Sequence, residues 1–574
     1  MSQARTIAPI QAQAIANAND LRSSLFPAPA PPSDSEEAEM LQQKLSTILQ
    51  VLDVGTSSRT FSIPEYNTPG TNTRAMVSSG SRKGLANAHK IWLSVLDTIA
   101  RLLSSGEPNS RYSATVDGDT RITILLAKSG LITKGDEGSS VELFGILSDP
   151  ARSFTTADVY SVGSVVEEKM IPFMTRSPGW NRWIGEIAAL VGQTNWDREF
   201  GNYLKRTDKA HLSKMPKSLI EAQLSVEHIF PVIGPEFGGF WQEGEPLPTP
   251  ASILRALVSE ISDTHQDFVV PKRDVVPPAN DAHSYRLKLG RFGRSCRTLV
   301  KTDFFEFLVG QKGAWSEENG FLRGRDARRL KHLLYNLHLQ VSGIWELVAK
   351  ANVVFSSGGE IRYRWVGDRA LDGSDSGHPG STVIVPADMK SIMQDVLHHP
   401  TEDDNHFSEK ELEMTKRMIL PEGRMLFDTA LETLKSETSW PQGLTLRGFD
   451  THLHPEIKLA LYLAGTGYRE TVKQTRLKLP IGSSEPVSWC TAVWLAEYQM
   501  TNGGSWYTII SYHDMDVSET WALPTVPLLN YGCLFRRKKL ETMQEDLCKV
   551  SEVVTNRVMT RLQRSFAQLG LDDA

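Results

Sequence analysis

From about residue 420 the sequence alternates between helix and strand patterns, and no other feature constrains the fold of the chain as strongly. Apolar residues recur at helical spacing in three segments, 425–435, 454–465 and 488–499. Runs typical of strands lie between and after them, at 444–449, 476–484 and 505–514. Because alternating helices and strands pack as layers, residues 421–574 are predicted to form an α/β helix–sheet sandwich. A long amphipathic helix closes this domain, and its apolar face is formed by Leu547, Val550, Val554, Val558, Leu562 and Phe566.

The 420 residues before this domain are predicted to be mainly helical. A chain of 574 residues is longer than one hydrophobic core supports, so several domains are expected. Residues 1–40 combine Pro-rich and acidic stretches and are predicted to be a flexible leader. Apolar residues at three- and four-residue steps predict a mainly helical N-terminal region at 41–240, which ends near a Gly- and Pro-rich segment. The middle region, 241–420, is also predicted to be mainly helical, with a strand hairpin near 360–386.

Composition and charge exclude several classes of protein. The net charge of −6 gives no overall attraction for polyanions or acidic membranes. Four cysteines in 574 residues are too few for a disulfide scaffold and suit a reducing compartment. The N-terminus lacks the apolar core of a secretory signal, and no apolar run approaches the length of about eighteen residues needed to span a membrane. We therefore expect an intracellular protein, cytoplasmic or nuclear, without a membrane segment. The RRKK run at 536–539 is either a nuclear-import signal or the exposed start of a helix.

Residues 451–467, THLHPEIKLALYLAGTG, contain the first candidate site. Pro455 suits the first turn of a helix, which places His454 at the helix start and Glu456 inside the first turn. A histidine there can bind a metal ion, and a carboxylate two residues later can lie beside the ion and accept a proton from bound water. The alternative is an ordinary helix start, in which His454 is a cap and Glu456 is stabilised by the helix dipole.

A second strand-to-helix junction follows at 481–499, IGSSEPVSWCTAVWLAEYQ. The zinc deaminase signature is His-x-Glu followed, after a gap, by Pro-Cys-x-x-Cys, with both halves at helix N-termini. Here the halves read HPE at 454–456 and PVSWC at 486–490, and WALP follows at 521–524. Residues 420–530 thus resemble the fungal deaminase-like proteins, distant relatives of the cytidine deaminases. The resemblance implies a three-layer α/β domain and a zinc-dependent hydrolase that deaminates a nucleobase in a nucleotide or nucleic acid.

Carried over by position, the resemblance implies that His454 and Cys490 are Zn²⁺ ligands and that Glu456 is the catalytic proton shuttle. One ligand is missing, because Val487 stands where the first cysteine belongs and cannot bind zinc. With a one-residue gap Ser488 takes that place, although a neutral hydroxyl is a poor substitute for a thiolate. Other candidate substitutes lack the spacing of the motif: His452, His513 and Asp514.

These residues leave two main interpretations open. In the first, a relocated ligand completes the zinc site, and the protein deaminates a cytosine- or adenine-type base. In the second, the chain is a pseudoenzyme whose pocket binds a nucleotide or nucleic acid without turnover, while its helical region binds a protein partner. Val487 is the feature that separates them, and a purely structural scaffold is a third interpretation.

A basic segment in the middle region is a separate candidate for nucleic-acid binding. Between residues 285 and 301 six basic residues occur without an acid, interleaved with aromatic residues. Neutralisation of phosphates together with stacking on bases is the functional interpretation, and a solvated helix face is the alternative. The candidate contacts are Arg286, Lys288, Arg291, Arg294 and Arg297.

Overall fold

The computed structural model describes ten main stretches of the chain, with short gaps inside several of them: 83–148, 160–201, 255–263, 282–308, 324–355, 361–367, 409–419, 453–465, 479–501 and 537–572. It also describes isolated residues or pairs within 42–52 and at 382–383, 396–397, 428, 449–450, 507–508 and 521. The leader predicted at residues 1–40 lies outside these ranges.

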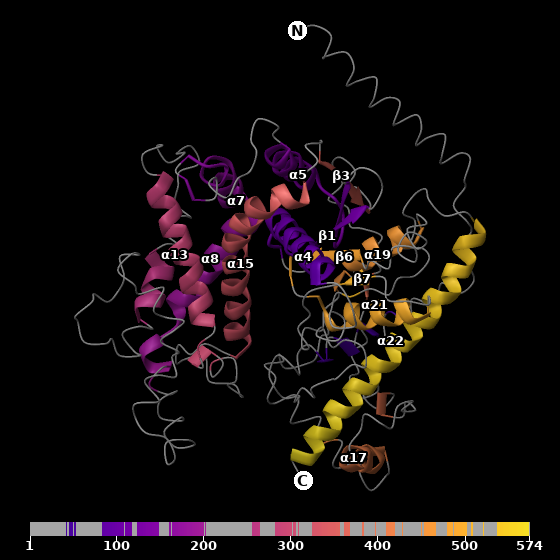
Figure 1. Ribbon diagram of the computed structural model, residues 1–574. Coiled ribbons are helices and arrows are strands. Elements are labelled where there is room, and N and C mark those ends of the chain that lie inside the picture. Colours follow the sequence, from indigo (N-terminus) through magenta and orange to yellow (C-terminus); the bar gives the residue numbers. More distant parts are fainter. Residues whose placement is uncertain are drawn as a thin grey trace.

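A small mixed sheet lies at the centre of one half of the molecule (Figure 1). Its strands follow the spatial order β3-β2-β1-β6-β7. β1 and β2 form an antiparallel hairpin, β6 runs antiparallel to β1, and the two outer pairs, β2–β3 and β6–β7, are parallel. The strand bounds are β1 Tyr112–Asp117, β2 Thr123–Lys128, β3 Arg362–Val366, β6 Leu479–Ser483 and β7 Tyr507–Thr508.

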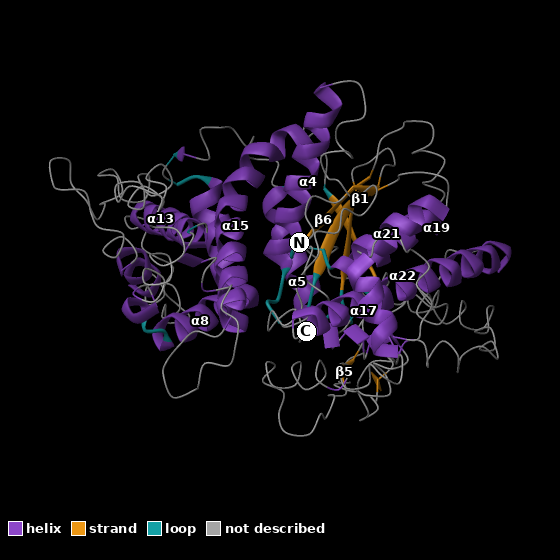
Figure 2. Ribbon diagram, turned by 90° about the horizontal axis from the view of Figure 1, so that it is seen from below, coloured by secondary structure: helices purple, strands orange, loops and turns teal. Residues whose placement is uncertain are grey.

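Helices cover both faces of this sheet (Figure 2). In β2, Ile124 and Leu126 belong to one hydrophobic core, whereas Leu125 and Ala127 belong to another. Because successive side chains of a strand point to opposite faces, this division shows a strand buried on both sides. α4 (Lys83–Leu103) packs on one face, and α19 (Pro455–Gly465) packs on the other. α21 (Trp489–Thr501) lies beside α19, and the long C-terminal helix α22 (Arg537–Asp572) packs against α21 and α17 (Glu409–Ile419).

The sheet joins segments that are far apart in the sequence. Ser113 of β1 pairs with Ser483 of β6, although 370 positions separate them. The α/β unit is therefore not confined to residues 421–574, as the sequence pattern predicted, because α4, β1 and β2 come from the region expected to be helical. The strands predicted near 360–386 both form, but they do not pair with each other. β3 joins the main sheet, and β4 (Thr382–Val383) pairs with β5 (Phe449–Asp450).

The remaining helices extend the core on the α4 side of the sheet. α15 packs against both α4 and α13, and α8 packs against α15. Close approaches mark these contacts: a Cβ on Gly343 of α15 would lie 2.9 Å from the Thr98 side chain of α4. The helices are α5 Lys134–Leu147, the π-helix η1 Val166–Met170, α7 Ile171–Arg176, α8 Pro178–Gln193, α13 Ala282–Val300 and α15 Gly324–Val354. The described part of the protein is thus mainly helical, with a small five-stranded sheet and a separate two-stranded one, and its helical region shares a continuous core with one face of the five-stranded sheet.

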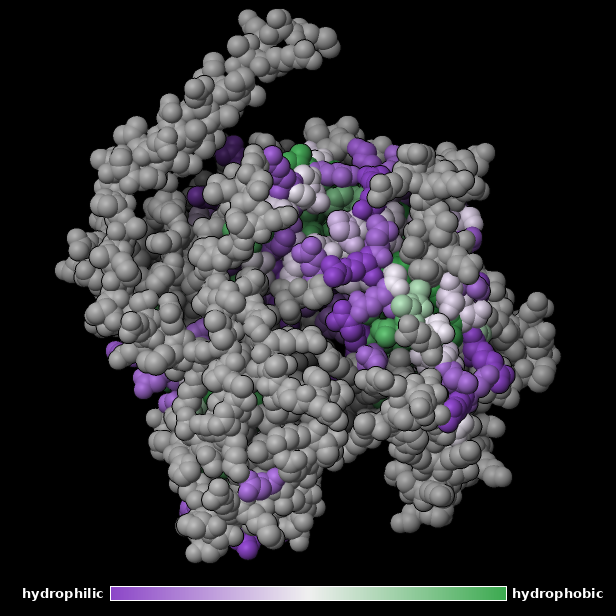
Figure 3. Space-filling view, turned by 180° about the vertical axis from the view of Figure 1, so that it is seen from behind, coloured by the Kyte–Doolittle hydropathy of each residue, from purple (hydrophilic) through white to green (hydrophobic). Residues whose placement is uncertain are grey.

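The described surface shows hydrophilic and hydrophobic residues interspersed on the face seen in Figure 3. Across the described residues the exposed large hydrophobic side chains are Val141, Tyr160, Leu287 and Tyr335. In the same part of the chain, none of the helices has both the length and the apolar character required to span a lipid bilayer.

Candidate functional site

Two helix starts meet at the candidate site. His454 precedes Pro455, the first residue of α19, and its carbonyl oxygen accepts hydrogen bonds from the N–H groups of Ile457 and Lys458 (both 3.1 Å). Ser488 caps α21, because its Oγ accepts a hydrogen bond from the N–H of Thr491 (3.3 Å). The sequence predicted both helix starts, and Pro455 occupies the position where its missing N–H costs nothing.

The imidazole of His454 contacts the second helix through two hydroxyl groups. Its Nδ1 lies 2.8 Å from Oγ1 of Thr491 and 3.3 Å from Oγ of Ser488. Thr491 Oγ1 also accepts hydrogen bonds from Ser488 Oγ (2.9 Å) and from Nε1 of Trp521 (3.2 Å). With both lone pairs of Thr491 Oγ1 accepting these bonds, its hydroxyl proton is directed to Nδ1. Ser488 donates its single proton to Thr491, so its 3.3 Å approach to Nδ1 is a contact rather than a second hydrogen bond. All four side chains are buried, and the network links α19, α21 and Trp521.

Cys490 lies between the two hydroxyl residues in sequence, but the structure places its thiol elsewhere. Successive residues of an α-helix are separated by about 100° around the axis, so Ser488 and Thr491 share a face and Cys490 lies about 100° or more from each of them. Its side chain is fully buried in the hydrophobic core with Val493 and Trp494. Burial raises the pKa of the Cys490 thiol to about 12, despite the opposing effect of the Arg561 guanidinium. The raised pKa disfavours the thiolate, which is the form of cysteine that binds zinc.

Glu456 is completely buried in the first turn of α19. Its Oε1 accepts hydrogen bonds from Ser113 Oγ on β1 (2.9 Å) and from Ser483 Oγ at the end of β6 (2.6 Å). Its Oε2 has no hydrogen-bond partner among the described residues. The carboxylate is thus fixed by one oxygen to two strands, and the other oxygen remains able to accept a hydrogen bond.

A second buried carboxylate, Asp97 of α4, shares Ser483 with Glu456. The N–H of Ser483 donates to Asp97 Oδ1 (2.8 Å), while its hydroxyl donates to Glu456. Burial raises the pKa of Asp97 from 3.8 to about 6, and the charge of Glu456 adds to this, whereas Arg101 and the Ser483 N–H oppose it. Ser483 therefore bridges two carboxylates on opposite faces of the sheet.

We expect Asp97 to make stability depend on pH between about 4 and 6. Because its pKa is higher in the folded state, its stabilising contribution is full below pH 4 and is lost as the pH rises through about 6. An asparagine keeps the acceptor for the Ser483 N–H but cannot ionise. Relative to Asp97→Asn, the wild-type protein should lose roughly 2–3 kcal/mol of unfolding free energy over this range. Urea unfolding of both proteins at pH 4 to 7.5 measures this difference, and a difference that does not change with pH contradicts the prediction.

Among the described residues, the groups that contact Nδ1 of His454 do not fit a zinc ion. Zinc in proteins is bound by thiolates, imidazole nitrogens and carboxylates, whereas Nδ1 of His454 contacts two neutral hydroxyls. Within the described ranges, no three His, Cys, Asp or Glu side chains form a group able to hold a metal ion. Val487, which precedes the capping residue Ser488, is buried. The other candidate substitutes, His452, His513 and Asp514, lie outside the described residues.

The basic residues predicted to bind nucleic acid lie along α13. Arg286 forms an ion pair with the buried Glu167 of η1 (2.9 Å), and Arg291 forms one with Glu260 (2.8 Å). Arg294 donates from Nε to the carbonyl oxygen of Gly290 (3.3 Å). Lys288 and Arg297 are exposed. Since two of the five cations are held by carboxylates of the protein itself, this arrangement favours a structural helix face over a phosphate-binding surface.

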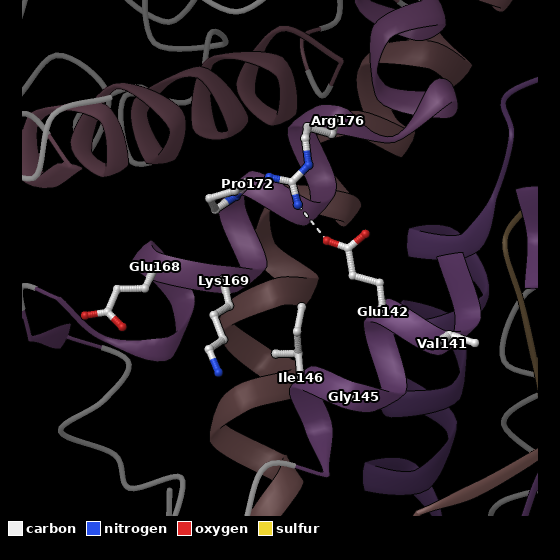
Figure 4. Close-up of a pocket in the computed structure, with 8 residues that line it drawn as sticks. All are labelled: Val141, Glu142, Gly145, Ile146, Glu168, Lys169, Pro172 and Arg176. Carbon is white, nitrogen blue, oxygen red and sulfur yellow. Dashed lines mark hydrogen bonds and ion pairs between the residues drawn. The ribbon is translucent and has the colours of Figure 1, made fainter. Parts of the chain in front are cut away.

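A shallow pocket of about 360 Å³ lies between α5 and the η1–α7 segment (Figure 4). Lys169 and Ile146 extend into the space between these helices, and Arg176 crosses it to pair with Glu142 (2.6 Å). Two cations and two carboxylates line the pocket, so it offers no net charge to a ligand. None of its residues belongs to the cluster around His454.

Sequence reasoning missed four residues of the site: Thr491, Ser113, Ser483 and Asp97. Helical spacing gave a signal for Thr491, because it lies three residues after Ser488 and therefore on the same face. Ser113, Ser483 and Asp97 gave no such signal, since their proximity to Glu456 depends on the packing of α4 and α19 against β1 and β6.

Comparison of the chain with protein-family models, with curated proteins and with solved structures finds no match of any of the three kinds. The function of this protein must therefore be inferred from the geometry of the site formed by His454, Glu456, Ser488 and Thr491.

Proposed function

We propose that this protein is a deaminase-like pseudoenzyme, which has lost zinc-dependent catalysis and acts as a binding or scaffold protein through its large helical region. The observation that carries this proposal is the contact of His454 Nδ1 with the hydroxyls of Thr491 and Ser488. A catalytic zinc site needs three protein ligands and an open fourth position. The hydroxyls occupy the space beside the imidazole, and Cys490 is buried in the hydrophobic core on another face of α21.

The packing of the helical region supports a scaffold role. Leu96 and Ile99 of α4, on one face of the sheet, belong to the same core as Leu334 and Ile344 of α15. A continuous core makes the helical region an integral part of the α/β unit rather than a tethered module. A partner bound on these helices would therefore be held rigidly relative to the sheet.

A second function, hydrolytic deamination of a nucleobase in a nucleotide or nucleic acid, is favoured by one specific observation. Glu456 lies in the first turn of α19, two residues after His454, and its Oε2 has no hydrogen-bond partner in the described part of the chain. A buried carboxylate with a free oxygen suits proton transfer. This alternative requires zinc ligands from outside the described residues, such as His452 or His513.

Metal content and ammonia release distinguish the two functions. We expect the purified protein to contain far less than one zinc per chain after dialysis against zinc-containing buffer. Incubation with cytosine and adenine nucleosides, nucleotides and single-stranded nucleic acids should release no ammonia above that of a Glu456→Gln variant. Circular dichroism of both proteins checks that they are folded.

A different result would support the active enzyme. One zinc per chain, lost in a His454→Ala variant, together with ammonia release that Glu456→Gln abolishes, would replace the pseudoenzyme with an active deaminase.

A further inference from the structure

Two pairs of residues at the start of α21 have the three-residue separation of a Cys-x-x-Cys motif. The first pair, Val487 and Cys490, follows Pro486 directly, as the deaminase signature requires. The second pair, Ser488 and Thr491, is displaced by one residue. The structure distinguishes the two pairs. Of the two, only the pair Ser488 and Thr491 places its side-chain atoms within hydrogen-bond distance of His454 Nδ1.

We infer that Ser488 and Thr491 occupy the positions of the two cysteine ligands of a former zinc site, and that their hydrogen bonds replace the metal as the link between the two helix starts. This inference rests on the proposed loss of zinc from a deaminase-like protein. It assigns Cys490, the ligand indicated by the sequence motif, to the hydrophobic core.

The distances among His454 Nδ1, Thr491 Oγ1 and Ser488 Oγ agree with a direct hydrogen-bonded link between the two helix starts. Ligand atoms around a tetrahedral zinc ion, at about 2.0–2.3 Å from the metal, are separated from one another by roughly 3.3–3.8 Å. Here the separations are 2.8 Å from His454 Nδ1 to Thr491 Oγ1, 3.3 Å from Nδ1 to Ser488 Oγ, and 2.9 Å between the two hydroxyls. Two of the three separations, those to Thr491 Oγ1, are thus shorter than the distances between zinc ligands and are hydrogen bonds. Trp521 Nε1 completes the network at Thr491 (3.2 Å).

The electrostatic environments of the two pairs also differ. Ser488 caps α21 and Thr491 lies in its first turn, where the N-terminal end of the helix dipole favours an anion such as a thiolate. A thiol at either position would also face an imidazole nitrogen. Cys490, by contrast, lies about 100° around the helix axis from Thr491 and is fully buried among apolar side chains. Thiols are thus expected to bind zinc at 488 and 491 and not at 490.

The double substitution Ser488→Cys/Thr491→Cys tests this assignment. We expect the variant to bind one zinc ion per chain and, with Co²⁺, to give the absorption bands of tetrahedral thiolate coordination. Adding His454→Ala to the double variant should weaken zinc binding at least tenfold. The matched control is Ser488→Cys alone, which also carries two thiols on this turn because Cys490 is native, and it should bind zinc at least a hundredfold more weakly than the double variant.

A second pair of variants tests the hydrogen-bonded link without metal and without new thiols. Thr491→Val keeps the shape of the side chain but removes the hydroxyl, whereas Thr491→Ser keeps the hydroxyl and removes a methyl group. If the network links the helices, Thr491→Val should lower the thermal midpoint by more than Thr491→Ser does. If Thr491 only fills space, the order reverses, and the link is refuted even where the double cysteine variant fails to fold.

The outcomes separate this inference from the proposed function. Stoichiometric zinc in the unmodified protein would contradict the proposed loss of zinc. Equal zinc binding by Ser488→Cys and by the double variant, or no zinc binding by a folded double variant, would refute the positions assigned here while leaving the proposed function intact.

Discussion

Substitution of Gly482 by alanine is expected to destabilise the protein by roughly 3 kcal/mol or more, because it forces apart two elements that pack backbone to backbone. A Cβ at position 482 of β6 would lie 2.4 Å from the backbone N of Asp97, 2.4 Å from the carbonyl carbon of Leu96, and 2.6 Å from the Leu96 Cβ. Two of these three atoms belong to the backbone of α4, so no change of rotamer relieves the overlap. The helix must move away from the sheet, and the hydrogen bond from Ser483 N–H to Asp97 is lost with it.

Gly185 provides the control for this prediction. It lies within α8, and a Cβ there would meet no heavy atom within 4 Å. Gly185→Ala should therefore stabilise the protein by roughly 0.5–1 kcal/mol, the difference in helix propensity between the two residues. Urea unfolding of the wild-type protein and the two variants measures both effects. A Gly482→Ala variant as stable as the wild type would show that α4 does not lie directly on β6.

Loss of the carboxylate of Asp136 is expected to cost roughly 3–5 kcal/mol, because it leaves a buried cation without its partner. Oδ2 of Asp136 accepts hydrogen bonds from Lys128 Nζ (2.9 Å) and from the N–H and the hydroxyl of Thr133 (both 2.7 Å). Oδ1 accepts one from the hydroxyl of Tyr112 (2.6 Å). Only 6% of Asp136 and 6% of Lys128 is exposed, so water cannot replace these contacts. Asp136→Ala therefore removes a tie that holds α5 to both β1 and β2.

Glu142→Ala on the same helix is the matched control. Glu142 pairs with Arg176 at 2.6 Å, but the side chains are 48% and 61% exposed, and such surface pairs contribute less than about 1 kcal/mol. Denaturant unfolding should therefore separate the two alanine variants by at least roughly 2 kcal/mol. A further readout is the pKa of Tyr112, which burial and the charge of Asp136 raise to about 12. It should fall in Asp136→Ala and remain unchanged in Glu142→Ala, and similar stabilities of the two variants would contradict the prediction.

The buried carboxylates of Asp97 and Asp136 illustrate why sequence reasoning misses residues that matter for the site and for the fold. Charged residues are mostly exposed, so Asp136 and Asp97 are expected on the surface from sequence alone. Asp136 is buried because four donors compensate its desolvation, and those donors belong to three different elements. The hydrogen-bond partners of Glu456 also come from distant elements, since Ser113 and Ser483 lie on strands separated by most of the chain.

The sequence by itself determined the local elements. Apolar periodicity located α19, α21 and α22, Pro455 marked the helix start beside His454, and a Ser at 488 supplied the cap of the next helix. These features depend on contacts within a few residues, so the local pattern contains the information needed to predict them.

Only the tertiary structure decided which strands form the sheet and which side chains face His454. Backbone hydrogen bonds are the same for any pair of strands, so nothing local indicated that β6 pairs with β1, whose residues lie some 370 positions earlier. A displacement of one residue along a helix turns a side chain by about 100°, so the motif spacing indicated Cys490, whereas Thr491 is the residue that contacts His454. The packing of α21 against α19 fixed that rotation, and it brought a hydroxyl rather than a thiol to the imidazole.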